Sequence, residues 1–276
     1  MSTPIHRVVA RAYKILRSEA YDRNIILRVL KSYLDIELQS RFCKNRSRAA
    51  VLDYRVDFLN PELFVYLFYE MFILAEYYFA CDKPNPRIID CGSNIGMSVL
   101  FFKTIFPESS ITCYEPDVQS YSRLVQNIEQ NGLGSVRAHN VAVCGTDGEK
   151  PFYFDSACPG CLSMGLYDHK ARGESRLIRT VRLSSTVTEP VDLLKLDVEG
   201  AELEVMKDLD QAGKLGFIDK IFLEYHHYMN GSRSDLSELL KILESNSFKF
   251  YISATSYNPF QMNRIQPMMI YARRQG

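Results

Sequence analysis

The sequence lacks an excess of charge of either sign, because 33 Lys and Arg residues balance 33 Asp and Glu residues. This balance gives no reason to expect a nucleic acid partner. Internal repeats and low-complexity tracts are missing too, and a hydrophobic content of 46% with 24% charged residues excludes a disordered class. The 276 residues suit one large domain, or one domain with an extension.

The sequence also lacks a long apolar run without charges. The most apolar stretch, residues 63–80, contains Glu70 and Glu76. Each acid would cost about 2.5–3.5 kcal/mol at the centre of a bilayer, so we expect a buried helix there and no transmembrane segment. The first 23 residues contain no apolar signal-peptide core, and the odd count of seven cysteines is typical of a reducing compartment. We therefore expect a cytoplasmic protein.

A second cysteine pair, which a zinc site would need, is missing as well. Cys158 and Cys161 form a single C-x-x-C pair, so we expect a plain loop there. The loop at residues 155–180 is rich in Gly, Ser and Arg, and its alternative interpretation is a lid over an acceptor.

Helical spacing of apolar residues is present through residues 5–40, and Pro61 suits the first turn of a further helix ending near residue 80. Residues 1–82 are therefore expected to form an all-helical extension or cap. Residues 1–56 carry twelve Lys and Arg against five Asp and Glu. This basic surface is either a solvated helical face or a contact for an anionic partner or membrane surface.

Residues 83–276 alternate between strand and helix patterns. Strand candidates at 87–91, 110–116 and 135–143 are separated by helix candidates, which predicts right-handed crossovers and a parallel sheet. Further strands are expected at 191–197 and 219–227, and two more, at 248–256 and 268–274, have no helix between them and should pair antiparallel. The fold class is therefore α/β, a doubly wound, Rossmann-like sheet of about seven strands.

Cofactor-binding residues are expected where these strands end. The loop DCGSNIG follows the first strand and contains Asp90, Gly92, Ser93, Asn94 and Gly96. Its glycines allow tight turning and close ligand approach. Glu115 ends the second strand, where an acid can bind ribose hydroxyls. Asn140 ends the third strand, where an adenine edge would lie.

The same loop discriminates between nucleotides. Asn94 stands where a dinucleotide fingerprint has its second glycine, and Asp90 would repel a pyrophosphate. An acid at that position suits an α-amino group instead. We therefore expect S-adenosylmethionine as the cofactor rather than a nicotinamide nucleotide.

Four segments in this order strengthen that expectation: IIDCGSNIGMSVLFFK, ITCYEPD, VDLLKLDVEGAELEVM and FLEYHH. They resemble the FkbM family of S-adenosylmethionine-dependent methyltransferases, from about residue 60 to the C-terminus. The resemblance implies a class I methyltransferase fold and O-methylation of hydroxyls on sugars or secondary metabolites. It also implies a set of residues lining the cofactor: Asp90, Gly92, Asn94, Gly96 and Glu115.

Methyl transfer to a hydroxyl needs a base, because a neutral alcohol is a poor nucleophile. Asp197 ends the fourth strand, beside the expected methionine moiety of the cofactor, and is thus a candidate for cofactor binding and for catalysis. Glu224 and His226 share one side of the fifth strand. We expect His226 or Asp197 to be the base, with Glu224 holding the tautomer of His226.

The remaining charges near these strand ends have plainer interpretations. Lys195 is expected to pair with neighbouring acids, and Glu202 to favour the positive end of a helix. A variant with Mg²⁺ held by Asp197, Glu224 and Glu199 fits the residue types but is not favoured. We therefore predict no metal site.

The interpretation that best unites these features is an O-methyltransferase acting on a small-molecule or glycan hydroxyl. One alternative is an NAD(P)-dependent oxidoreductase on a similar sheet. Another is a non-catalytic, methyltransferase-like module that binds partners through the basic extension.

Overall fold

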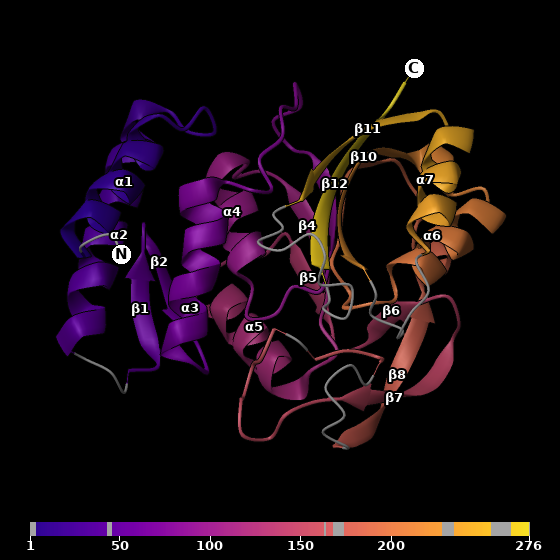
Figure 1. Cartoon of the computed structure of the whole chain (residues 1–276), viewed down its shortest axis with the longest axis horizontal. Coiled ribbons are helices and arrows are strands. Elements are labelled where there is room, and N and C mark those ends of the chain that lie inside the picture. The colour runs from indigo at the N-terminus through magenta and orange to yellow at the C-terminus, as the bar shows by residue number, and fades with distance from the viewer. Residues whose placement is uncertain are drawn as a thin grey trace.

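The computed structural model describes residues 4–42, 46–162, 164–167, 174–227, 235–254 and 266–275. Its centre is a seven-stranded sheet with the order β11-β12-β10-β9-β3-β4-β5 (Figure 1). The strands are β3 (Arg87–Cys91), β4 (Ser110–Tyr114), β5 (Val136–His139), β9 (Val191–Leu196), β10 (Ile218–His227), β11 (Phe248–Ala254) and β12 (Gln266–Arg274).

Five of these strands run parallel, from β10 through β9, β3 and β4 to β5. Strand β12 runs antiparallel to both neighbours, β10 and β11, which confirms the predicted antiparallel pair. The order is the doubly wound α/β arrangement predicted from the sequence and is that of a class I methyltransferase sheet. The carboxyl ends of the five parallel strands consequently meet at one edge.

Helices cover both faces of this sheet (Figure 1). On one face, α4 (Met97–Ile105) and α5 (Val118–Gln130) share a buried core with Ile88, Ile111 and Leu193. On the other face, α6 (Glu202–Gln211) and α7 (Leu236–Ser245) pack on Leu194 and Ile221. Successive strand residues point to opposite faces, so nearly continuous apolar strands supply both cores.

The expectation of an all-helical extension is wrong. Helices α1 (Pro4–Leu16) and α2 (Arg23–Phe42) are followed by an antiparallel hairpin of β1 (Arg48–Val51) and β2 (Tyr54–Asp57). Val51 and Val56 in the hairpin are fully buried, and Leu52 turns the chain with a φ of 51°. Runs of four residues are too short for alternation to be distinguished from a helix.

Helix α3 (Pro61–Phe68) begins at the predicted proline, and the Asn60 side chain accepts hydrogen bonds from the N–H groups of Glu62 and Leu63. It does not continue to residue 80. A π-helix, η1 (Tyr69–Leu74), follows and ends where Ala75 adopts a left-handed conformation with a φ of 52°. The rings of Phe72 in η1 and Phe101 in α4 pack edge to face with centroids 5.8 Å apart. The extension therefore shares the core of the sheet, and the division at residue 82 stays a prediction.

A second, three-stranded sheet lies beside the carboxyl edge of the large one (Figure 1). It has the order β6-β8-β7 and consists of β6 (Ala142–Cys144), β7 (Gly148–Tyr153) and β8 (Ser175–Arg182). Short turns η2 (Leu183–Ser185) and η3 (Leu215–Phe217) complete the fold. None of the helices in the described ranges is both long and apolar enough to cross a bilayer.

Candidate active site

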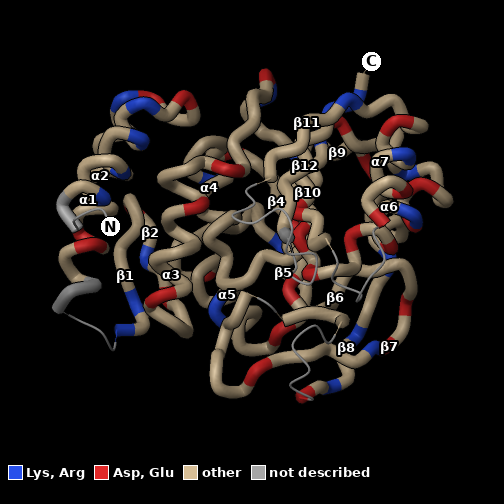
Figure 2. Tube along the Cα trace, viewed as in Figure 1, with Lys and Arg blue, Asp and Glu red and all other residues tan. Residues whose placement is uncertain are grey.

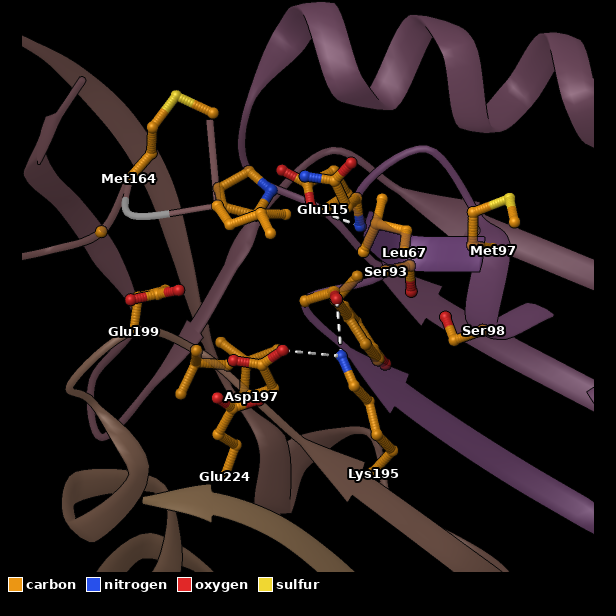
Figure 3. Close-up of a pocket in the computed structure, with 18 of the residues that line it drawn as sticks. Leu67, Ser93, Met97, Ser98, Glu115, Met164, Lys195, Asp197, Glu199 and Glu224 are labelled. Atoms are coloured by element: carbon orange, nitrogen blue, oxygen red, sulfur yellow. Dashed lines mark hydrogen bonds and ion pairs between the residues drawn. The ribbon is translucent and has the colours of Figure 1, made fainter. Parts of the chain in front are cut away.

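A pocket opens at the carboxyl edge of the parallel strands (Figure 3). Its walls come from the loop after β3, the ends of β4, β9 and β10, the small sheet, and the α3–η1 segment of the extension. The space between these walls is about 1100 Å³ with its open mouth included, enough for a small-molecule ligand. The charged residues lining it are Glu70, Glu115, Lys195, Asp197, Glu199 and Glu224.

The glycine loop forms the floor of the pocket. Gly92 has a φ of 82°, and a Cβ there would lie 1.8 Å from the carbonyl oxygen of Asp197, so no larger residue fits. The N–H groups of Gly92 and Ser93 donate to the carbonyl oxygen of Tyr114. Asn94 is also left-handed, with a φ of 47°, and its N–H donates to Glu115 Oε2 at 2.8 Å. Gly92, Ser93 and Asn94, which the sequence predicted to bind the cofactor, all line the pocket.

Gly96 serves packing instead. Its φ is 90° at the start of α4, and a Cβ there would lie 2.7 Å from Leu124 Cδ1 on α5. Among the described residues, Gly96 is not one that lines the pocket. It lets the helix approach its neighbour, which keeps the loop close to the strand ends.

Glu115 holds the turn after β4 in place. Its Oε1 accepts from the N–H of Asp117 at 2.7 Å, and burial raises the pKa of this carboxyl to about 8. Asn140, predicted to face an adenine, is exposed and instead donates through Nδ2 to the carbonyl oxygens of Glu115 and Pro116, at 2.9 and 3.1 Å. The structure thus places Asn140 behind the turn, outside the pocket lining that it describes.

Lys195 joins the floor to the acids, as predicted. Its Nζ lies 2.7 Å from the carbonyl oxygen of Gly92, 3.2 Å from Asp197 Oδ2 and 3.5 Å from Asp90 Oδ1. Burial alone would lower the pKa of Lys195, but the charges of Asp197 and Asp90 raise it overall, so the side chain is an ammonium. Asp90 is fully buried beneath it and accepts from Ser98 Oγ at 2.6 Å. Asp90 therefore acts on the pocket through Lys195.

His226 lies among three carboxyls. Its Nδ1 is 3.0 Å from Glu202 Oε1, and its Nε2 is 3.4 Å from Glu199 Oε2 and 3.9 Å from Glu224 Oε1. Burial would lower the pKa of His226, but the neighbouring charge of Glu202, followed by that of Glu199, raises it well above the usual value. A protonated imidazole has no lone pair to accept a proton, and His226 does not line the described pocket.

These contacts correct three predictions. His226 is not placed as a base, and its Nδ1 is oriented by Glu202 rather than by Glu224. Glu202 is also more than a charge at a helix start, because it is only 1% exposed and its Oε1 accepts from the N–H of Gly200 at 2.9 Å. The contact between Glu202 and His226 arises only because folding packs α6 against β10.

Asp197 and Glu224 do line the pocket at neighbouring strand ends, as predicted (Figure 3). Burial raises the pKa of Glu224 to about 8 and that of Glu199, in the turn after β9, to about 8. Glu70 from η1, which the sequence reasoning did not select, also lines the pocket, and burial raises its pKa to about 7. The sequence feature that could have identified Glu70 is its position as an acid within the most apolar run of the chain.

The carboxyls do not favour a magnesium site. Ligand atoms of Asp197, Glu199 and His226 lie within 4.8 Å of one another. Mg²⁺ prefers oxygen ligands, however, and His226 contributes a ring nitrogen and is hydrogen-bonded to Glu202. This set also differs from the predicted one, which included Glu224, so the magnesium variant gains no support.

The residues present do fit S-adenosylmethionine. Glu115 offers a buried carboxylate beside the floor, suited to ribose hydroxyls. Apolar side chains of the small sheet and its loop, Val143, Phe152, Leu162 and Met164, form a wall suited to adenine. The acids at the ends of β9 and β10 outnumber Lys195, which suits a sulfonium and an ammonium group.

Comparison with known proteins agrees with this geometry. Residues 90–250, more than half of the chain, match the Methyltransferase FkbM domain family. Methyltransferase 1 of Beauveria bassiana is 27% identical over 245 residues, covering 81% of this chain and 92% of that protein. The 2-O-methyltransferase NoeI of Sinorhizobium fredii is 26% identical over 142 residues, covering 45% of this chain and 58% of NoeI.

Among solved structures, methyltransferase FkbM from Methylobacillus flagellatus is 13% identical with a TM-score of 0.49, covering 97% of this chain and 59% of that chain. The family match decides against the nicotinamide and non-catalytic interpretations of the sequence. The chain belongs to the FkbM family of S-adenosylmethionine-dependent methyltransferases.

Proposed function

We propose that this methyltransferase acts on a hydroxyl of a small molecule, a sugar or glycan or a secondary metabolite, with Glu224 as the base. One observation carries the proposal: the Glu224 carboxyl faces the pocket from the end of β10, next to the strand that ends at Asp197. A hydroxyl must lose its proton as it attacks, and a base whose pKa lies near the working pH accepts it best. The pKa of about 8 for Glu224 suits that task.

The neighbouring groups have distinct roles in this proposal. When bound, S-adenosylmethionine supplies an electrophilic methyl group on a sulfonium. Asp197 pairs with Lys195 and faces the cationic end of the cofactor. Glu224 accepts the proton of the attacking hydroxyl. His226 stays protonated behind Glu199 and Glu224 and limits the repulsion between these carboxyls.

The choice of oxygen as the acceptor atom has support from two sides. An uncharged amine carries its own lone pair and needs no base before it attacks, whereas a hydroxyl does. One relative of this chain is named a 2-O-methyltransferase. A panel of glycosides and phenolic alcohols would identify the acceptor molecule.

The experiment is a methyl-transfer assay that measures S-adenosylhomocysteine formation with that panel and locates the new methyl group by NMR. Glu224→Gln keeps the shape of the side chain and removes the base, so turnover should fall by about 10²–10⁴-fold while S-adenosylhomocysteine affinity changes less than about twofold. The exposed Glu108→Gln serves as the matched control. A methyl group on nitrogen, or full turnover by Glu224→Gln, would overturn the proposal.

We also propose that the basic extension contacts an anionic membrane surface. Helix α1 contains no Asp or Glu, and Lys and Arg recur along α1 and α2 (Figure 2). Val9, Tyr13 and Leu16 share one side of α1 and are 54–62% exposed. Exposed apolar residues flanked by basic ones are typical of helices that lie on anionic lipid.

We propose that the protein resides in the cytoplasm. Three thiols, those of Cys91, Cys113 and Cys144, are buried and form no disulfide. Thiols that stay reduced in a core are consistent with a reducing compartment. Fractionation of cells that express the full chain would test this location.

A further inference from the structure

We propose that Glu70 and Tyr66 of the extension form an acceptor subsite, which accepts a hydrogen bond from a second hydroxyl beside the one that is methylated. The acceptor class is then a neutral vicinal polyol. The identification of this half of the pocket with the acceptor rests on the hydroxyl methylation proposed above.

The subsite is built by the π-helix. Tyr66, Leu67, Glu70 and Met71 all line the pocket, and π-helical turns within helices are frequent at functional sites. The segment is anchored on either side of Glu70, because the rings of Phe68 and Phe72 are almost completely buried and stack with centroids 5.4 Å apart. Glu70 is therefore held at the pocket by the core rather than carried on a loose loop.

Its neighbours place Glu70 in one half of the pocket. The strands that end at the pocket are adjacent in the order β10, β9, β3, β4. Glu115, suited to the ribose, follows β4, whereas Asp197 follows β9 and Glu224 lies near the end of β10. The charges acting on Glu70 are those of Glu76, Asp197 and Lys195, and Glu224 acts on Tyr66. The pair therefore lies over the β9–β10 half, away from the ribose side.

The chemistry of this half selects a neutral, hydroxyl-rich acceptor. The Tyr66 hydroxyl interacts with the Glu70 carboxyl, which keeps lone pairs for a ligand. With Glu224 taking the proton of the reacting hydroxyl, Glu70 can accept a hydrogen bond from a neighbouring hydroxyl. Phosphorylated or carboxylated acceptors would face the charges of Glu70, Asp197 and Glu224.

Binding to the protein saturated with S-adenosylhomocysteine tests the subsite without turnover. Saturation-transfer NMR would compare three probes: methyl glucoside as the neutral polyol, cyclohexanol with a single hydroxyl, and glucose phosphate as the anion. Methyl glucoside should bind best, and Glu70→Gln should weaken it by about five- to tenfold, since the hydrogen bond to a charged acceptor is lost. S-adenosylhomocysteine affinity should change less than about twofold.

Glu62→Gln is the matched control, because Glu62 lies on α3 of the same segment and is exposed, yet it does not line the described pocket. It should leave methyl glucoside binding unchanged. Tyr66→Phe, at a side chain 48% exposed, is a second variant that preserves the fold and should weaken the probe by about threefold.

Equal affinity of wild type and Glu70→Gln for methyl glucoside would overturn the role of Glu70. A parallel loss of S-adenosylhomocysteine affinity would assign Glu70 to the cofactor instead. Preference for cyclohexanol or glucose phosphate, or no binding of methyl glucoside, would overturn the acceptor class. If methyl glucoside binding depends on Glu70 while the enzymatic methyl group is found on nitrogen, the proposed function fails and the subsite stands.

Discussion

Replacing Lys195 by methionine would test whether the buried ammonium holds the pocket floor and the acids together. Methionine is similar in length and apolar, so the change removes the charge and its hydrogen bonds with little change in volume. Lys195 Nζ now contacts the carbonyl oxygen of Gly92 and the carboxyls of Asp197 and Asp90. The side chain of Asp197 is 23% exposed and can regain water, whereas that of Asp90 is fully buried.

The expected cost comes mainly from Asp90. Breaking a buried ion pair by removing one partner costs about 3–5 kcal/mol, because the other charge stays buried without compensation. In a domain of this size each kcal/mol lowers the melting temperature by about 2–4 °C, so Lys195→Met should lose about 6–20 °C. Adding Asp90→Asn removes the orphaned charge, while the amide oxygen can still accept from Ser98. The double variant should therefore be more stable than Lys195→Met alone.

Urea unfolding followed by circular dichroism would measure these free energies, with S-adenosylhomocysteine affinity measured in parallel. Lys207→Met is the control, because Lys207 forms a surface pair with Glu238 at 2.8 Å and such pairs contribute about 0–1 kcal/mol. A loss below about 1 kcal/mol for Lys195→Met would refute the reasoning. So would a double variant whose loss equals the sum of the two single losses, since the charges would then be uncoupled.

Three further predictions concern the loop, the carboxyls and the extension. Gly92→Ala should lower S-adenosylhomocysteine affinity at least about tenfold in calorimetry, because its Cβ would meet the Asp197 carbonyl, whereas Gly134→Ala, with open space around it, should not. The free energy of unfolding should fall as pH rises from about 4.5 to 8, because the pocket carboxyls with pKa values raised to about 7 or 8 bind protons more tightly when folded; a flat or rising profile would contradict this. The protein should sediment with vesicles that contain anionic lipid, and the double variant Lys14→Glu, Arg17→Glu should reduce the fraction of protein bound to them. Equal binding of the protein to neutral vesicles would contradict the electrostatic contact.

Local patterns determine most of the sheet. The apolar runs that form β3, β4, β9 and β10 and the helices between them are properties of neighbouring residues, so strand order and direction follow from crossover rules. Asn60 and Pro61 likewise mark the start of α3 through adjacent backbone groups. By contrast, hairpin strands of four residues and a π-helical turn have no distinct period of apolar residues in the sequence. Their structure is determined by packing against α4 and α5.

The sequence by itself determined the fold class, the glycine loop after β3 and the positions of Asp197 and Glu224 at adjacent strand ends. Only the tertiary structure decided what the side chains there can do. His226 is kept protonated by Glu202 and Glu199, and Glu70 reaches the pocket from a segment more than a hundred residues away from Asp197 in the chain. The pKa of a side chain depends on its burial and on the charges that folding brings near it, so it cannot be read from the residues adjacent in the sequence.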